Sequence, residues 1–374
     1  MSAIRGTNGP ASTLVHMNWE SLDWEVLDEL REKFLTGTAA HGPYWHTLTD
    51  LECYDFTYGE RIGWKWDAVL RELKLRNWTP PAAATVLDWG CGSGIAGRRV
   101  VEFFGASHFA RLLVHDHSAL AMDFAEHHGR KAFPRLPVER ASTRLLRGDE
   151  PIDVLVISHV LNELNEIARA ELGELLARAQ TVLWVEPGTH EVSRLLGGWR
   201  EKLVPRMQAI APCPHQTTCG VLAAGNERHW CHFFAAPPNG VQADAGWVRF
   251  GQRAGIDLRS LPYSFLVLDG RMASVGRALE PATNAGNVGA KPRPTGEILA
   301  RIIGEPRHYK GYAKIFACAT DGVAELTLQK RDAPEVFKAL KHADGPLVYR
   351  WTRGGDRVTA VTSHFPEFPD SGTT

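Results

Sequence analysis

The sequence predicts an α/β protein built around a doubly wound parallel sheet. Between residues 84 and 207, short apolar runs alternate with longer amphipathic stretches, as strands and helices do in such a sheet. A glycine-rich turn follows the first apolar run, where sheets of this kind bind nucleotides. A cluster of cysteines and histidines at residues 211–234 then interrupts the pattern. We therefore expect a ligand-binding sheet that carries an inserted metal or cluster site.

Residues 1–80 predict an N-terminal helical cap. Apolar side chains recur at three- and four-residue steps over Trp19–Leu35 and over Glu60–Trp78, which is the spacing of amphipathic helices. The Thr-Pro-Pro sequence at residues 79–81 predicts a hinge between this cap and the sheet.

The second predicted domain, residues 81–275, holds the sheet and the Cys-rich insertion 211–234. The expected strands are Ala84–Leu87, Leu112–His115, Pro151–Ser158, Thr181–Glu186 and Tyr263–Asp269. The expected helices are Ile95–Phe104, Asn162–Gln180 and Glu191–Met207. Because strands and helices alternate at this spacing, we expect the first four of these strands to run parallel, and Tyr263–Asp269 is a candidate to complete the sheet.

The turn after the first strand reads Asp-Trp-Gly-Cys-Gly-Ser-Gly over residues 88–94. Glycines let the chain turn tightly and let a ligand approach the backbone, while the next helix supplies free N–H groups. Asp116 ends the second strand, where an acid can accept hydrogen bonds from ribose hydroxyls. The spacing differs from the G-x-x-x-x-G-K-[ST] of P-loop proteins and from the G-x-G-x-x-G of dinucleotide enzymes.

This turn resembles motif I of class I S-adenosylmethionine (SAM)-dependent methyltransferases. The resemblance implies a Rossmann-like methyltransferase sheet in which Asp116 holds the ribose of SAM. It also implies that the other cofactor-lining residues are Asp88, Gly90, Gly92 and Gly94.

The Cys-rich insertion has the residue types of a metal or cluster site. Cys213, Cys219 and Cys231 lie with three histidines in 24 residues of a chain that has six cysteines. The C-x5-C-x11-C spacing leaves open an iron–sulfur cluster, a tetrahedral zinc with His215 or His232 as fourth ligand, and no metal.

The third predicted region, residues 276–374, is a linker followed by a small β-rich module. Residues 279–295 are rich in Gly, Pro, Ala and Asn and predict a loop. The expected strands are Tyr312–Cys318 and Val323–Gln329, joined by a turn at Asp321-Gly322, then Leu347–Trp351 and Arg357–Val361. We expect the tail after Pro366 to be mobile.

Charge and hydropathy narrow the classes of function. The formal net charge is −1, but residues 291–357 hold 13 Lys+Arg against 8 Asp+Glu, a local +5 that leaves −6 elsewhere. A basic C-terminal region fits an RNA partner, and a basic solvated face fits equally. No run approaches the ~20 apolar residues of a membrane span, and no secretory signal is evident. We expect an intracellular, reducing compartment.

Further motifs recur, in this order, in one known family. They are Asp116-His117-Ser118, Ser158–Leu164, Glu186–Thr189, Ala211–His215 and Trp230–Phe233. From Thr85 to Lys330 the chain thus resembles the methyltransferase-like family associated with the small subunit of the mitochondrial ribosome, which has bacterial members and is often labelled an rRNA methyltransferase. The chain departs from this family at its C-terminal Trp-Gly-Asp, which has no clear counterpart here; Asp344–Pro346 is the nearest stretch.

That resemblance implies cofactors, partners and a location. Ser158 joins the SAM-binding residues, and a [4Fe–4S] cluster is held by Cys213, Cys219, Cys231 and Cys318. The implied partner is the small ribosomal subunit with its rRNA, in the bacterial cytoplasm or in a mitochondrion.

The catalytic group is less defined than the cofactor site. The fourth strand ends in Ser-His-Val-Leu instead of the Asn/Asp-Pro-Pro-Tyr clamp of amino-methylating enzymes, and His159 and Glu163 are the candidate bases. We therefore weigh a SAM-dependent rRNA methyltransferase against a non-catalytic ribosome-assembly or RNA-binding factor that keeps the SAM fold. A small-molecule methyltransferase with a structural zinc is the third hypothesis.

Overall fold

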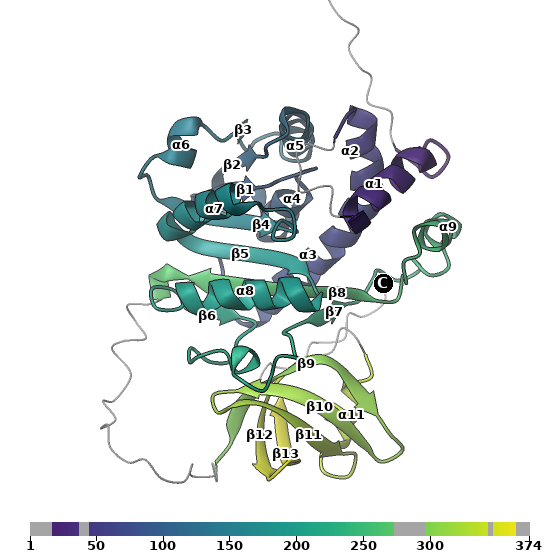
Figure 1. Cartoon of the computed structure of the whole chain (residues 1–374), viewed down its shortest axis with the longest axis vertical. Coiled ribbons are helices and arrows are strands. Elements are labelled where there is room, and N and C mark those ends of the chain that lie inside the picture. Colours follow the sequence, from purple (N-terminus) through teal and green to yellow (C-terminus); the bar gives the residue numbers. More distant parts are fainter. Residues whose placement is uncertain (1–16, 37–44, 273–295, 343–346, 364–374) are drawn as a thin grey trace, which may run out of the picture.

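The computed structural model describes residues 17–36, 45–272, 296–342 and 347–363. An α/β unit with one large sheet lies above a smaller closed β-barrel, with the Cys-rich segment between them (Figure 1). The predicted linker 279–295, the Asp344–Pro346 stretch and the tail after Pro366 fall outside the described residues. Within the described ranges, no helix is long and apolar enough to cross a membrane.

The large sheet has eight strands in the order β3-β2-β1-β4-β5-β8-β6, with β7 paired to β8. Strands β1 to β5 are parallel, and β8 is antiparallel to β5, β6 and β7. The strands are β1 (Ala84–Trp89), β2 (Phe109–His115), β3 (Val138–Arg140), β4 (Ile152–Ser158), β5 (Ala179–Pro187), β6 (Gln208–Ala211), β7 (Phe233–Ala235) and β8 (Leu261–Asp269). The predicted doubly wound sheet is confirmed. The sequence analysis missed the short strands β3, β6 and β7.

Helices cover both faces of this sheet, which is why β4 and β5 are apolar almost throughout. Helices α3 and α4 pack on one face, and α7 and α8 pack on the other. The helices are α3 (Glu60–Leu75), α4 (Ile95–Phe104), α5 (Ala119–Ala132), α6 (Thr143–Arg147), α7 (Glu166–Arg178), α8 (His190–Leu203) and α9 (Ala245–Ala254). The predicted helix Ile95–Phe104 has the same bounds as α4.

The N-terminal helices bring side chains to the edge of the sheet where β1 ends. Helices α1 (Trp24–Thr36) and α2 (Leu48–Tyr54) lead through a π-helical turn, Asp55–Gly59, directly into α3. Both carboxylate oxygens of Asp55 accept hydrogen bonds from Arg98 Nη2, at 2.7 and 2.9 Å. This bond fixes the π-helical turn, a feature frequent at functional sites, beside the glycine loop.

The C-terminal unit is a closed five-stranded barrel in the order β10-β11-β13-β12-β9. Its elements are β9 (Ile298–His308), β10 (Tyr312–Ala319), β11 (Gly322–Gln329), α11 (Pro334–Ala339), β12 (Val348–Gly354) and β13 (Arg357–Ser363). The predicted hairpin at Asp321-Gly322 joins β10 to β11. The first strand, β9, and the closure of the barrel were not predicted.

Candidate functional site

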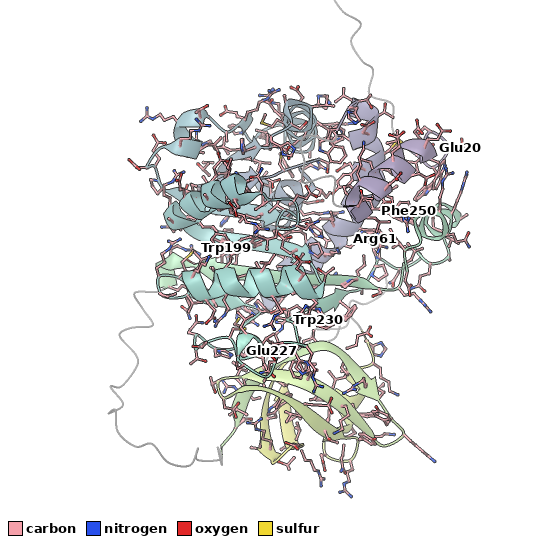
Figure 2. The ribbon with its side chains drawn as sticks, viewed as in Figure 1. Glu20, Arg61, Trp199, Glu227, Trp230 and Phe250 are labelled. Carbon is pink, nitrogen blue, oxygen red and sulfur yellow. The ribbon has the colours of Figure 1, made fainter. Side chains whose placement is uncertain are left out.

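A cavity of about 960 Å³ opens at the carboxyl ends of β1, β2, β4 and β5, where ligands bind in sheets of this kind. The glycine loop and the end of β4 form one wall. The π-helical turn and α3 form the opposite wall, and Figure 2 labels Arg61 on that helix. Predicted site residues that line the cavity are Gly90, Gly92, Asp116, Ser158, His159 and Glu163.

The glycine loop is shaped by backbone angles and close approaches. Gly90 (φ 68°), Gly92 (φ 50°) and Gly94 (φ 78°) all adopt left-handed angles. A Cβ on Gly90 would lie 2.7 Å from Val160, and one on Gly94 would lie 2.8 Å from Ala125, whereas one on Gly92 would meet nothing within 4 Å. Gly92 therefore gives a ligand access to the backbone, while Gly90 and Gly94 let neighbouring segments pack.

The two predicted acids have different surroundings. Asp116 lines the cavity, and its carboxylate accepts hydrogen bonds from the backbone N–H groups of Gly92 and Ser118, both at 2.9 Å. Asp88 lies behind the loop and accepts from the Gly97 N–H at 2.9 Å. Its Oδ1 is buried without a partner among the described residues, and burial raises its pKa to about 7. Neither Asp88 nor Gly94 lines the cavity, so these two support the loop.

The end of β4 carries a hydrogen-bonded group that joins it to α3. His159 has a left-handed backbone (φ 56°), and its Nε2 lies 3.1 Å from Lys65 Nζ. Its Nδ1 lies 3.3 Å from the Ser158 hydroxyl, which also accepts a hydrogen bond from Trp66 Nε1 at 3.0 Å. Burial and the nearby Lys65 charge hold the pKa of His159 well below its usual value, so its imidazole is neutral.

Glu186, at the end of β5, fixes the chain after His159. It accepts hydrogen bonds from the Val160 N–H at 3.2 Å, the Leu161 N–H at 3.3 Å and Trp184 Nε1 at 2.7 Å. Its side chain is fully buried, and burial raises its pKa to about 7. Glu186 thus orients His159 through the backbone.

Two cations on α3 were missed by sequence reasoning. Lys65 is partly buried in the cavity wall, and burial together with the charge of Arg61 lowers its pKa to about 7. Arg61 is 9% exposed, and its Nη1 has no partner among the described residues. The sequence did contain one signal for Lys65. It lies between Trp64 and Trp66 in an apolar helix, where a lysine has little access to water.

The four predicted cysteine ligands meet between the α/β unit and the barrel. Cys213, Cys219 and Cys231 follow β6, and Cys318 lies on β10. Burial raises the pKa of Cys231 well above its usual value, and charges on the other three raise it further, so all four lie within electrostatic range. Within the described ranges, no group of three or more His, Cys, Asp or Glu side chains is arranged to hold a metal ion.

Polar side chains hold these cysteines in place. Arg200 Nε on α8 donates to Cys213 Sγ at 3.1 Å, and its Nη2 donates to the His215 carbonyl at 3.1 Å. His215 Nε2 lies 3.2 Å from Cys318 Sγ. We call the four cysteines with Arg200, His215 and Arg301 the cysteine junction.

Arg301 connects the cysteine junction to helix α3. It lies on β9, its side chain is 2% exposed, and it forms an ion pair with Glu72 on α3. Its guanidinium lies 4.0 Å from the Phe233 ring centroid on β7. Figure 2 labels Trp230, which precedes β7, between the sheet and the barrel.

Comparison with known families gives one match. The model of the family described as mitochondrial small ribosomal subunit Rsm22 matches residues 65–346, about three quarters of the chain. The chain belongs to the Rsm22 family. The resemblance inferred from the sequence motifs is thereby confirmed at the level of the family. The Rsm22 match begins at Lys65 and takes in the glycine loop, the end of β4, the cysteine junction and the barrel elements from β9 to α11, while Arg61 and the π-helical turn precede it and β12 and β13 follow it.

Comparison with curated proteins gives no match. Among solved structures, a precorrin 8W decarboxylase from Methanobacterium thermoautotrophicum has TM-score 0.32 and 11% identity, covering 54% of this chain and 87% of its own. A SAM-dependent methyltransferase from Aquifex aeolicus has TM-score 0.29 and 17% identity, covering 37% and 79%. A ribosomal protein L11 methylase from Lactobacillus delbrueckii has TM-score 0.28 and 20% identity, covering 39% and 71%. The strand order of this Rsm22 chain itself gives it the predicted Rossmann-like methyltransferase fold.

Proposed function

We propose that this Rsm22-family chain is a SAM-binding methyltransferase-like protein that acts on, or assembles, the small ribosomal subunit. The observation that carries the proposal is the cavity at the glycine loop, with the open face of Gly92 beside the Asp116 carboxylate. That pairing suits a nucleoside ligand. Membership of the Rsm22 family supports a ribosomal partner. Its compartment would be that of the ribosome, a bacterial cytoplasm or a mitochondrion.

The cavity walls offer complementary charges for the parts of SAM. Asp116 would accept hydrogen bonds from the ribose hydroxyls, and the loop at Gly92 would take the nucleoside against its backbone. Arg61 and Lys65 place positive charge on the opposite wall, where the ligand carboxylate would be stabilised. Ser158, at the end of β4 in the same wall as the glycine loop, accepts a hydrogen bond from Trp66 on α3.

SAM supplies an electrophilic methyl group when bound, so the protein must position an acceptor and manage a proton. Positioning accounts for much of the rate of such a transfer. His159 is the best-placed base in the cavity, because its neutral imidazole is fixed by Lys65 and Ser158. Glu163 also lines the cavity and is the second candidate.

The four cysteines would hold a [4Fe–4S] cluster. In such a cluster each thiolate binds a different iron atom, so the ligands surround a larger object than one ion. The four thiols supply the donor set, and Arg200 places a positive charge beside Cys213 that suits thiolates. In this assignment His215, 3.2 Å from Cys318 Sγ, is a neighbour of the cluster.

A non-catalytic assembly factor is the second candidate function. It is favoured by the end of β4, where Ser158 and His159 stand in place of the polar clamp of amino-methylating enzymes. Such a factor would keep the cavity and the junction and transfer no methyl group. A small-molecule methyltransferase with a structural zinc has less support, because the Rsm22 match, to a family described by the small ribosomal subunit, reaches into the barrel.

Calorimetry with SAM, followed by mapping of methylated nucleotides in small-subunit rRNA from a deletion strain, tests the proposal. We expect binding in wild type and loss of binding in Gly92→Val, whose side chain would fill the open face of the loop. Ile167→Ala, at an exposed side chain on α7, is the control. Binding together with a missing methyl mark supports the enzyme, and binding with every mark intact supports the assembly factor. Absence of SAM binding in wild type would falsify both.

A further inference from the structure

The barrel has the topology of an oligonucleotide-binding fold. Numbered one to five along the chain, its strands β9 to β13 are joined in the closed order 1-2-3-5-4. The third and fifth strands, β11 and β13, are parallel, while the other neighbours are antiparallel. The helix α11 lies between the third and fourth strands. This five-stranded Greek-key barrel matches the OB-fold, which binds oligonucleotides on its second and third strands and adjoining loops.

One end of that binding face is already covered by the Cys-rich segment. Cys318 and Phe316, on the outer face of β10, pack against this segment, and the His229 ring stacks on Phe316 at 4.2 Å. A Cβ on Gly220 would lie 3.0 Å from the backbone of Gly322, at the turn between β10 and β11. This end of the face therefore belongs to the cysteine junction.

The other end of the same strands is open and aromatic. Tyr309 follows β9 and Tyr312 begins β10, and their rings stack with centroids 4.7 Å apart and planes at 12°. They are 46% and 37% exposed. The Tyr309 N–H donates to the Tyr312 carbonyl at 2.8 Å, which fixes the loop that carries both rings. Among the described residues, the other large apolar side chains this exposed lie outside the barrel: Leu35, Ile167, Leu195 and Met272.

Basic side chains surround the two tyrosines. Exposed Lys310 lies between them in the chain, and Lys330 is adjacent because its N–H donates to the Gly311 carbonyl at 3.0 Å. Arg307 and Lys314 flank the loop on β9 and β10, and both pair with Glu325, the facing acid on β11. Among the described residues, Lys310 and Lys330 form no ion pair. The four cations therefore outnumber the one facing acid, and this end of the face carries net positive charge.

We propose that the open end of this face, where Tyr309 and Tyr312 stack, binds single-stranded RNA. Bases would stack on the exposed ring of the tyrosine pair, and Lys310, Lys314 and Lys330 would contact the phosphates. Two stacked rings held by a backbone hydrogen bond present a ready platform, since neither ring must be ordered on binding. The inference rests on the proposed association with ribosomal RNA, and it is independent of SAM and methyl transfer.

The test is fluorescence anisotropy of the full chain with a labelled oligouridylate of about 12 nucleotides, a length within the range of OB-fold sites. We expect binding that weakens steeply with salt, and weaker binding of an RNA duplex of equal length. The Tyr309→Ala/Tyr312→Ala double variant should bind about tenfold or more weakly. The matched control, Tyr309→Phe/Tyr312→Phe, keeps both rings and should stay within about twofold of wild type.

Two outcomes would overturn the inference. One is equal affinity for the duplex. The other is wild-type affinity in the double alanine variant, and if that variant also no longer associates with the small subunit, the face docks a protein. Circular dichroism and urea denaturation, compared with wild type, show whether the variants fold. If RNA binding follows the tyrosines while wild type binds no SAM, the methyltransferase proposal fails and this one stands.

Discussion

The ligand cavity and the cysteine junction are assembled in opposite ways. The glycine loop, Asp116 and His159 follow successive strands of one parallel sheet, so the topology alone brings them to the same edge. The junction takes Cys213 from the segment after β6 and Cys318 from the barrel, and it needs both units in place. A site within one sheet tolerates changes in the second unit, whereas a shared site couples the two. Removing the junction should therefore affect the barrel and its RNA binding more than SAM binding.

The largest expected effect is loss of the proposed [4Fe–4S] cluster in Cys318→Ser. Anaerobically purified wild type should be brown with about four irons per chain, and the variant should lose both, because the fourth ligand comes from the barrel. Iron analysis measures the first effect, and calorimetry with SAM should give an affinity close to that of wild type.

Cys53→Ala is the matched control, since this buried cysteine lies outside the junction and should leave iron unchanged. A colourless wild type with one zinc per chain would contradict the cluster. If Cys318→Ser lost SAM binding together with its iron, the ligand cavity and the cysteine junction would not be independent of each other.

The next effect is on stability, through the ion pair that joins the barrel to α3. Arg301→Met removes one of the two arginines that pair with Glu72, while Arg76 still pairs with this carboxylate at 2.8 Å, so the free energy of unfolding should fall by about 1–3 kcal/mol. Urea denaturation measures it. Arg253→Met breaks the exposed pair with Asp28, which is screened by solvent, and should leave the free energy of unfolding almost unchanged. Equal costs for the two variants would show that the junction does not depend on this pair.

The same contrast explains what the sequence could predict. The strands of the sheet and the glycine loop are local patterns, and alternating strands and helices admit few topologies, so the position of the cavity edge followed from the sequence. The meeting of Cys318 with Cys213 was reached through the family resemblance, because nothing local in β10 marks that cysteine as a ligand.

Lys65, Arg61 and Glu186 were missed for a different reason. Each is one charged residue in an apolar stretch, and its role depends on which face of a helix or strand turns inward. The order of the strands in the barrel could also not be predicted from the sequence, because a strand pattern gives the position of each strand in the chain and not its neighbours in the sheet. Closure through the parallel pair of β11 and β13 decides the OB topology, and these strands are separated by α11 and β12.

The smallest effect concerns the pH dependence of the cavity. Burial, and then the charge of Arg61, lower the pKa of Lys65 to about 7, so Lys65 is cationic below that pH and neutral above it. If Lys65 stabilises the SAM carboxylate, its contribution to affinity is present at about pH 6 and disappears by about pH 8. Lys65→Met should bind about tenfold more weakly than wild type at the lower pH and equally at the higher pH.

SAM has an amino group that titrates in the same range, so the informative quantity is the difference between variant and wild type at each pH. Lys65→Arg supplies the control, because a guanidinium stays protonated over this pH range. The ratio of its SAM affinity to that of Lys65→Met should therefore be the same at every pH. Calorimetry at several pH values measures all three proteins. If the ratio of SAM affinities between wild type and Lys65→Met did not change with pH, Lys65 would not lie near the SAM carboxylate. The cavity would then resemble the junction, in which buried charges join elements of the fold to one another.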